Sequence, residues 1–373
     1  MTSQPLYAMN LAQRLPSSRS SVSRAALWSL LAAAGAAVAA PGTGNPDGKC
    51  TVPVAGRAAN VTNPTHVIGT GTPASCTSEA VVKAVAAGGV ITFNCGPDPV
   101  TITMKQTAKV FNDRPNVTID GGGKVTLSGG GVRRILYQNT CDPAQKWTTD
   151  HCHTQELPKL TVQNLTFTRG NSAGQTYGLG EVLGGGAIYV RGGQFKVVNS
   201  RFFKNSCEAT GPDLGGAAVR VFGNSPVAPV YITNSTFGGG RLYANNCSNG
   251  GAISGLHASF TITNSLITYN NAIGYGANPP AQGTPGGGSG GAIYQDGNTI
   301  DLTMCGTKIA HNHAKEGGGA SFFVSNDLTG TMSITDSTLI DNPSDKFETR
   351  GLPGIFILAR PGQPVITNSI LKP

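Results

Sequence analysis

The chain has 373 residues, of which 52 are glycine and only 12% are charged, and its formal net charge is +8. The glycines do not recur at every third position, which excludes a collagen-like triple helix. The segments between them are rich in Val, Ile, Phe and Thr, which excludes a disordered chain. The basic residues form no cluster, so we expect no nucleic-acid partner. This composition predicts many short strands joined by tight turns.

Residues 1–39 are predicted to be an export signal. Three arginines, the last at Arg24, precede an apolar run over 25–36, and Ala37-Val38-Ala39 matches the pattern of small residues at signal cleavage sites. The alternative is an uncleaved anchor, but the run is too short for a comfortable span of a bilayer. We therefore expect cleavage after Ala39, no membrane span in the mature protein, and a secreted, periplasmic or cell-surface location.

The mature chain is predicted to begin with an N-terminal extension over 40–75, followed by the main domain over 76–373. Cys76 and Cys95 bracket a helix expected over 78–87 and a strand expected over 90–93. Further strands are expected around 100–102 and 117–119, where β-branched residues predominate.

Two short motifs recur in phase along the rest of the chain. Gly-Gly-Ala begins at Gly185, Gly215, Gly250, Gly290 and Gly318, at spacings of 28–40 residues. A glycine pair suits a turn that needs positive φ or a close approach of two backbones. In the second motif an apolar residue and a spacer precede Asn or Asp, at Asn164, Asn199, Asn234, Asn264, Asp336 and Asn368. Six residues further on a second Asn often follows, at Asn205, Asn270, Asn312 and Asn342.

This repeat predicts an all-β fold. No apolar stripe with a period of 3.6 residues accompanies it, whereas a coil of three short strands fits its length. Such coils stack about 4.8 Å apart, so that equivalent residues lie directly above one another. The predicted architecture is a single-stranded right-handed parallel β-helix, a solenoid with a short N-terminal helical cap.

An exported chain can use its eight cysteines in disulfides. The cysteines expected in disulfides are Cys76, Cys95, Cys141, Cys152, Cys207 and Cys247. Cys141 and Cys152 would close a polar loop, and stacking of consecutive coils would bring Cys207 and Cys247 within bonding distance. The alternative for this last pair is two buried free thiols. Cys50 and Cys305 remain without an assigned pairing.

The Gly-Gly-Ala-Ile and Phe-x-x-Asn repeats, as at 185–188 and 202–205, resemble those of polymorphic outer membrane proteins. They also resemble those of bacterial right-handed β-helix repeat proteins of the pectate-lyase-like superfamily. The segment from Cys76 to Cys95 is similar to the N-terminal cap of many such exported proteins. The resemblance covers the chain from about residue 76 to the end. It implies the fold but no single function, because this fold occurs in lyases, hydrolases, adhesins and passive shells.

Enzymes that resemble pectate lyases place acid, base and calcium-binding residues on one exposed parallel sheet, which here would follow the Gly-Gly-Ala turns. The residues at these places, which we call the strip, are Tyr189, Arg191, Arg220, His257, Tyr294, Gln295 and Asp296. In a lyase acting on uronic acids, Arg191 and Arg220 would neutralise the carboxylate and His257 would be the base. Asp296 would hold a cation, with calcium as the implied cofactor, and Tyr189, Tyr294 and Gln295 would contact the ligand. The alternative is an ordinary solvated face, and a one-residue slip in strand alternation would turn half of these side chains away.

Two histidine-containing clusters were weighed as metal sites. Cys141, Cys152 and the histidines at 151 and 153 are of the types that bind zinc, but a loop disulfide explains the cysteines more simply. His311, His313 and Glu316 form the second cluster, for which a turn between coils is the simpler explanation. No metal ligand is assigned.

Two functions therefore remain open. The first is an exported protein that binds or processes extracellular or cell-wall polysaccharide. As an enzyme it would be a polysaccharide lyase rather than a glycoside hydrolase, because no Asn-Thr-Asp, Asp-Asp or Gly-His-Gly motif occurs. The second is a non-catalytic, adhesin-like cell-surface protein. Long insertions at 142–156 and 274–288 would favour the first if they wall a cleft over the strip, and the second if they protrude alone. In either case we expect a monomer.

Overall fold

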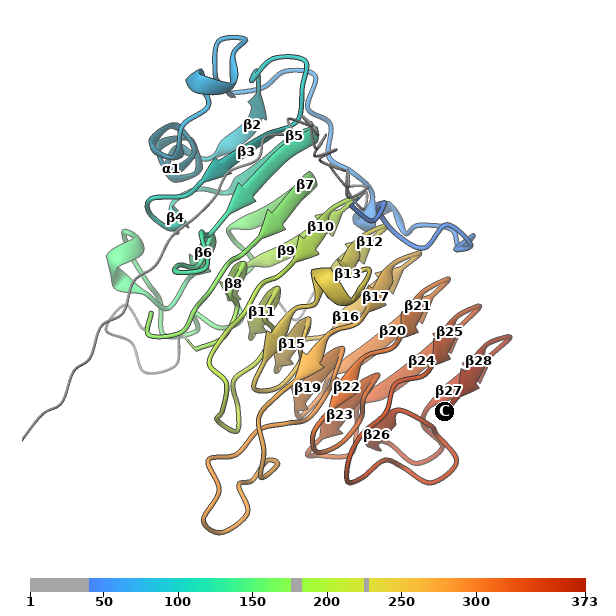
Figure 1. Cartoon of the computed structure of the whole chain (residues 1–373). Coiled ribbons are helices and arrows are strands. Elements are labelled where there is room, and N and C mark those ends of the chain that lie inside the picture. Colours follow the sequence, from blue (N-terminus) through green and yellow to red (C-terminus); the bar gives the residue numbers. More distant parts are fainter. Residues whose placement is uncertain (1–39, 176–182, 225–227) are drawn as a thin grey trace, which may run out of the picture. The chain divides into compact units, whose positions relative to one another are not determined.

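Turns of glycine and asparagine interrupt the chain every few residues, and the strands between them stack in parallel. The computed structural model describes residues 40–175, 183–224 and 228–373, so the predicted export signal at 1–39 lies outside the described residues. Residues 41–373 form one unit. Within it, successive coils add strands to the same sheets in a solenoid-like stack (Figure 1).

The strands belong to three sheets, and the pairings between named strands are parallel. The largest sheet contains β1 (His66–Ile68), β2 (Gly89–Phe93), β3 (Val100–Thr103), β5 (Asn116–Ser128), β7 (Lys159–Thr168), β9 (Gln194–Val198), β10 (Arg201–Phe203), β12 (Val230–Thr233), β13 (Thr236–Gly238), β16 (Phe260–Thr263), β17 (Leu266–Thr268), β20 (Asp301–Cys305), β21 (Lys308–Ala310), β24 (Thr331–Thr335), β25 (Thr338–Ile340), β27 (Val365–Thr367) and β28 (Ile370–Lys372). The eight-stranded sheet contains β4 (Ala108–Val110), β6 (Leu136–Asn139), β8 (Ile188–Arg191), β11 (Val219–Phe222), β15 (Ile253–Leu256), β19 (Ile293–Gly297), β23 (Ser321–Ser325) and β26 (Ile355–Leu358). The smallest contains β14 (Asn246–Cys247), β18 (Asn271–Ala272) and β22 (His313–Ala314).

Helices are few and short. The α-helix α1 (Ser78–Ala87) coincides with the predicted cap helix. It begins where the Thr77 side chain accepts a hydrogen bond from the Ala80 amide, and it ends at Gly88, whose φ is 78°. Four 3-10 turns accompany it: η1 (Val54–Gly56), η2 (Pro73–Ser75), η3 (Pro143–Gln145) and η4 (Arg241–Tyr243). Among the described residues, no helix is long and apolar enough to cross a membrane.

The strand register confirms the predicted stacking and corrects the alignment of one Gly-Gly-Ala motif. Val219 pairs with Ile188 on one side and Ile253 on the other, which aligns Gly216, not Gly215, with the first glycine of the other motifs. Glycine is required at these turns for two reasons. Gly290 has a φ of 71°, and a Cβ on Gly291 would lie 2.3 Å from the carbonyl oxygen of Gly319 in the next coil.

Both predicted asparagine positions occupy stacked turns. The first series adopts the left-handed conformation, with φ of 47° at Asn199, 45° at Asn234 and 49° at Asn264, a region that asparagine tolerates better than most residues. The second series is buried and forms a continuous side-chain ladder. Each Nδ2 donates to the Oδ1 of the next asparagine at 2.8–2.9 Å, in the order Asn205, Asn245, Asn270, Asn312 and Asn342.

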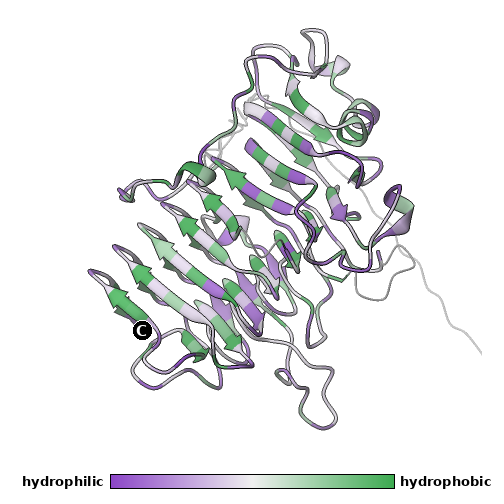
Figure 2. Ribbon diagram, turned by 180° about the vertical axis from the view of Figure 1, so that it is seen from behind, coloured by the Kyte–Doolittle hydropathy of each residue, from purple (hydrophilic) through white to green (hydrophobic). Residues whose placement is uncertain are grey.

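Hydrophobic and hydrophilic residues alternate along several strands (Figure 2), and the buried hydrophobic ones form a core inside the stack. Phe167, Phe202 and Phe237 show the arrangement: their rings stack with centroids 5.1 and 4.6 Å apart, and all three are fully buried. Aromatic rings packed in this way add a specific attraction to the hydrophobic stabilisation. Each coil thus completes the core of its neighbours.

The predicted N-terminal extension is part of the solenoid rather than a separate segment. The main sheet begins before the expected boundary at residue 76, because β1 pairs with β2, with His66 opposite Ile91. Residues 41–59, which we call the strap, lie across the asparagine turns. Asn264 accepts from the Cys50 amide at 2.9 Å and donates to its carbonyl oxygen at 2.8 Å. Farther along, the Ala59 amide donates to the Gln163 side chain at 2.8 Å.

Four disulfides fasten the described chain. The expected pairs Cys76–Cys95, Cys141–Cys152 and Cys207–Cys247 are present, and the last joins consecutive coils across a Cα–Cα distance of 4.8 Å. The alternative of two free thiols at 207 and 247 is therefore wrong. The fourth pair, Cys50–Cys305, attaches the strap to the turn that follows β20. Cys305 lies in the repeated coils, opposite Thr263 and Thr335, but Cys50 lies in the strap outside them, so the repeat provides no register that would pair the two.

We expect Asn270→Ala to lower the free energy of unfolding by roughly 3 kcal/mol, because it leaves several buried polar groups without partners. The amide of Asn270 donates to the Phe237 carbonyl at 3.1 Å, and its oxygen accepts from Asn245. The exposed Asn298→Ala is the matched control and should change stability by less than about 0.5 kcal/mol. Chemical denaturation followed by circular dichroism measures both, and equal losses would contradict a stabilising ladder.

Replacing Cys50 and Cys305 together by alanine should destabilise the protein more than replacing Cys141 and Cys152. The first disulfide spans 255 residues and the second only 11. Closing the longer loop restricts the unfolded chain more, by about 3 kcal/mol. Thermal unfolding of the two double variants measures the difference, and a smaller loss for the long-range pair would refute this account.

Candidate functional site

The outer face of the eight-stranded sheet carries two columns of side chains. In one column Arg220 pairs with Tyr189 and Ser254, and the column continues through Tyr294 and Phe322 to Phe356. The second column contains Arg191, Phe222, Leu256, Asp296, Val324 and Leu358 in equivalent register. Residues between the columns, such as Val221 and Phe323, are fully buried in the core. The strip of the sequence analysis therefore lies largely on one face.

One strip residue was placed wrongly. Gln295 lies between Tyr294 and Asp296 and so faces inward, where it is fully buried and its amide donates to the Ala258 carbonyl at 3.0 Å. The successive residues Tyr294, Gln295 and Asp296 could not all face outward, because side chains alternate along a strand. Gln295 is thus a core residue and not a ligand contact.

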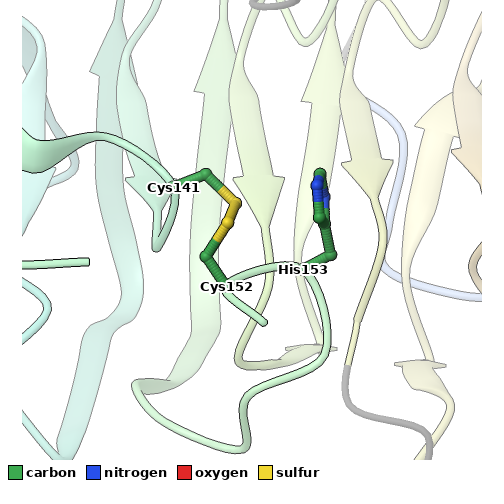
Figure 3. Close-up of side chains that lie close together, drawn as sticks. All are labelled: Cys141, Cys152 and His153. Carbon is green, nitrogen blue, oxygen red and sulfur yellow. A yellow bond between two sulfur atoms is a disulfide. The ribbon is translucent and has the colours of Figure 1, made fainter. Parts of the chain in front are cut away.

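The insertion at 142–156 covers the first part of the strip. The guanidinium of Arg191 contacts the ring nitrogens of His153 at 3.1–3.2 Å and lies 4.6 Å from the centre of the Phe222 ring. The disulfide between Cys141 and Cys152 holds His153 in this place (Figure 3). Arg191 is only 8% exposed as a result.

Tyr189 is also enclosed. It is fully buried, its ring stacks on Tyr137 with centroids 5.7 Å apart, and the Arg134 guanidinium lies 5.1 Å from its ring centre. Tyr189 and Arg191 therefore form a packed polar layer, and neither borders the open part of the sheet face. The three residues proposed for lyase chemistry, Arg191, Arg220 and His257, are not brought together in one open site.

An open cleft of about 920 Å³ occupies the later part of the same face. Its floor consists of outward-facing apolar residues from β11, β15, β23 and β26. The floor residues are Phe222, Leu256, Phe322, Val324, Phe356 and Leu358. Polar strip residues Arg220, His257 and Asp296 line it as well, together with Asn326.

Two loops form one wall of the cleft. Pro212 and Asp213 come from the loop after β10, whereas Asn278 and Pro279 come from the 274–288 insertion. The loops are joined by a hydrogen bond from the Gly211 amide to the Gly286 carbonyl at 2.9 Å. Beneath the insertion, buried Glu316 accepts from the Gly276 amide at 2.8 Å and from Lys346 at 3.0 Å. The insertion is thus anchored over the strip and does not stand apart from it.

Asn278 connects the polar groups of the wall and the floor. Its Nδ2 lies 2.5 Å from Asp213 Oδ1, 2.8 Å from the Tyr294 hydroxyl and 3.4 Å from Asp296 Oδ2. The two carboxylate oxygens are consequently within about 6 Å of each other. Asp213 is exposed and Asp296 is half-buried.

Burial and neighbouring charge shift the pKa values of two ionisable side chains in the cleft. Desolvation raises the pKa of Asp296 above its ordinary value, and the negative charge of Asp213 adds to this effect. A hydrogen bond from Asn326 acts in the opposite direction. Desolvation also raises the pKa of Tyr294 well above its usual range, so this hydroxyl stays neutral.

Arg220 is the single arginine or lysine among the described residues that line the cleft. Its side chain is 3% exposed, with one terminal nitrogen donating to Ser254 Oγ at 2.6 Å and the other to the carbonyl oxygen of Asp213. Its Nε has no hydrogen-bond partner among the described residues. A buried donor in that state is costly.

Several cleft residues were not predicted. Phe322 follows the fifth Gly-Gly-Ala motif at the place of Tyr294 in the fourth, so continuing the strip by one coil would have found it. Phe356 lies on a coil without that motif, and only the pairing of β26 with β23 reveals it. Asp213 and Asn278 are in loops of unique sequence, where the repeat carries no information.

The clusters considered for metal do not form thiolate sites. Among the described residues, two groups of three potential ligands lie close together: Cys141, Cys152 and His153, and Cys50, Cys305 and Asp336. Each includes a disulfide, whose sulfurs are not thiolate ligands. In the other cluster, His311 and His313 approach separate aspartates, at 3.4 and 2.7 Å.

No family model, curated protein or solved structure matches this chain.

The raised pKa of Asp296 predicts a pH-dependent difference between the parent and Asp296→Asn. A carboxyl with a raised folded-state pKa contributes stability that is present at low pH and lost as the pH rises through that pKa. The variant should therefore gain stability relative to the parent between about pH 3.5 and pH 7. Thermal unfolding across this range measures the gain.

Asp327→Asn provides a control of opposite sign. Desolvation alone would raise the pKa of Asp327, but hydrogen bonds from Thr329 and Ser325 outweigh it and lower the pKa. A lowered pKa contributes stability at neutral pH that is lost on acidification, so this variant should lose stability relative to the parent as the pH rises. The same direction in both variants would contradict the assigned environments.

Proposed function

We propose that this chain is an exported protein that binds extracellular or cell-wall polysaccharide in the cleft on the eight-stranded sheet. The observation that carries the proposal is the union, in one open cleft, of an apolar and aromatic floor with converging polar groups. Sites for small molecules and chain segments combine these two features. The polar groups orient a ligand rich in hydroxyls, while the aromatic faces cover its apolar side.

The floor supports this proposal because it leaves large apolar side chains accessible. Leu358 is 46% exposed, and Leu256, Val324 and Phe356 are half-buried. Contiguous apolar surface rimmed by polar residues is typical of interaction sites. Around it, the Asn326 amide and the Asp296 carboxylate supply both donors and acceptors, as a chain of sugar hydroxyls requires.

The solenoid would be a right-handed parallel β-helix, as expected for the pectate-lyase-like resemblance. Connections between parallel strands of one sheet are right-handed in nearly all proteins, which supports this handedness. Export is supported by the four disulfides, since disulfides are rare in the cytosol. A monomer suffices for the proposal, because every group named in the cleft belongs to one chain.

The alternative, an adhesin-like surface protein without a ligand cleft, would leave the 274–288 insertion free to protrude. The position of Asn278 and Pro279 in the cleft wall favours the polysaccharide function instead. The decisive experiment screens the purified protein against immobilised neutral, basic and acidic polysaccharides. Absorbance of unsaturated products and reducing-end release would show whether binding is followed by lyase or hydrolase chemistry. Retention of no polysaccharide would refute the proposal.

Leu358→Arg should weaken polysaccharide binding at least about tenfold, because a long charged side chain would cover the apolar floor and leave its charge among the aromatic rings. Leu242→Arg is the matched control, since Leu242 is 68% exposed and does not line the cleft. Isothermal titration calorimetry with the polysaccharide retained in the screen measures both affinities. Equal affinities in the two variants would place the binding site elsewhere.

A further inference from the structure

Among the described residues, the accessible carboxylates of the cleft outnumber its accessible basic side chains, because Asp213 and Asp296 line it with one exposed histidine, His257. Asp213 is exposed on the wall and Asp296 is half-buried beside it. The one guanidinium that lines the cleft, that of Arg220, is 3% exposed and both of its terminal nitrogens are engaged. A ligand entering from solvent therefore meets carboxylates first, and an anionic sugar would be repelled by them.

A nitrogen atom already occupies the place where these acceptors converge. Asn278 Nδ2 lies within hydrogen-bonding distance of three oxygens, which belong to Asp213, Tyr294 and Asp296. An amide nitrogen has two hydrogens and no full charge, whereas an ammonium has three hydrogens and a positive charge. The arrangement therefore suits an ammonium group better than the amide that holds it.

Two further features of the cleft suit the remainder of an amino sugar. Beside the carboxylates the floor presents apolar side chains, among them Phe222, Leu256 and Leu358, the last 46% exposed, and the carbon-bound hydrogens of a sugar ring pack against such a surface. Independently of the carboxylates, Arg220 lines the same cleft, and its buried Nε has no partner among the described residues.

We infer that the cleft selects polysaccharides with free amino groups, such as glucosamine chains, over their acetylated counterparts and over uronic acids. The sugar ammonium takes the place of Asn278 Nδ2 between Asp213 and Asp296. This inference rests on the proposed function and names its ligand class. It departs from the uronic-acid ligand considered from the sequence, because the two arginines assigned to carboxylate binding, Arg191 and Arg220, are buried and engaged.

The test compares tetramers of glucosamine, N-acetylglucosamine and galacturonic acid by calorimetry at about pH 5.5, where an exposed aspartate is ionised. The glucosamine tetramer should bind at least about tenfold more tightly than the acetylated one, as expected for a charge-assisted hydrogen bond. A matched or reversed order of these two affinities would overturn the inference while leaving the polysaccharide function intact. Tighter binding of galacturonate would do the same. Binding of none of the three, together with no retention in the wider screen, would overturn both proposals.

Two substitutions distinguish the effect of the cleft's charge on ligand preference from the effect of its shape. Asp213→Asn should bring the preference for glucosamine over N-acetylglucosamine down to about twofold or less, while affinity for the acetylated tetramer stays close to that of the parent. Asp301→Asn, an exposed change outside the cleft, is the control and should keep the full preference. An unchanged preference in Asp213→Asn would refute the assigned contact.

The Asn278→Ala variant tests directly whether the ligand ammonium displaces the Asn278 amide. Because the ligand ammonium no longer competes with the amide for the same oxygens, this variant should bind the glucosamine tetramer at least as tightly as the parent. A loss of affinity confined to this tetramer, with unfolding temperature unchanged, would show that the amide is itself a ligand contact and would contradict the inference.

Discussion

The hydrogen bonds between consecutive coils are the constraint on which the rest of the structure depends. Each short strand is marginal alone, but the parallel ladder places it opposite the equivalent strand of the next coil, as with Val219 between Ile188 and Ile253. Residues 30 to 40 apart in the sequence thereby become neighbours. Every other regularity of the fold, including the aromatic stack and the asparagine ladder, follows from this alignment.

The turns must satisfy the same alignment, and this explains their composition. A coil has to reverse direction without separating from its neighbours, so its turn residues need positive φ, minimal bulk or an internal hydrogen-bond partner. Gly290 and Gly291 supply the first two properties, and the Asn270 side chain supplies the third. These requirements recur once in each coil, so the same residue types recur in the sequence. The repeat can therefore be recognised although its period varies.

The repeated part of the fold was therefore predictable, and the unique part was not. The stacking of Asn199 on its equivalents and the Cys207–Cys247 disulfide follow from the period, and the structure contains both. The cap helix precedes the repeats and was predicted from its local sequence, and it too is present. The repeat shows to which coil a residue belongs, but it does not show which side of the strand the residue faces, because a shift of one residue reverses the side. For this reason Gln295 was wrongly expected to face outward. The pairing of Cys50 with Cys305 could not be predicted, because the strap that contains Cys50 crosses the coils without a repeated sequence motif.

The difference between repeated coils and unique insertions also explains where the candidate site lies. The outer face of the eight-stranded sheet is a regular grid, and alone it would be an ordinary solvated surface. The 142–156 insertion covers one part of the grid and places His153 on Arg191, whereas the 274–288 insertion leaves the next part open and extends Asn278 over Asp296. Insertions of unique sequence thus convert a uniform face into a buried layer and a cleft. The character of the cleft then depends on the charges that the loops add, because the Asp213 carboxylate reaches solvent while the Arg220 guanidinium beneath it does not.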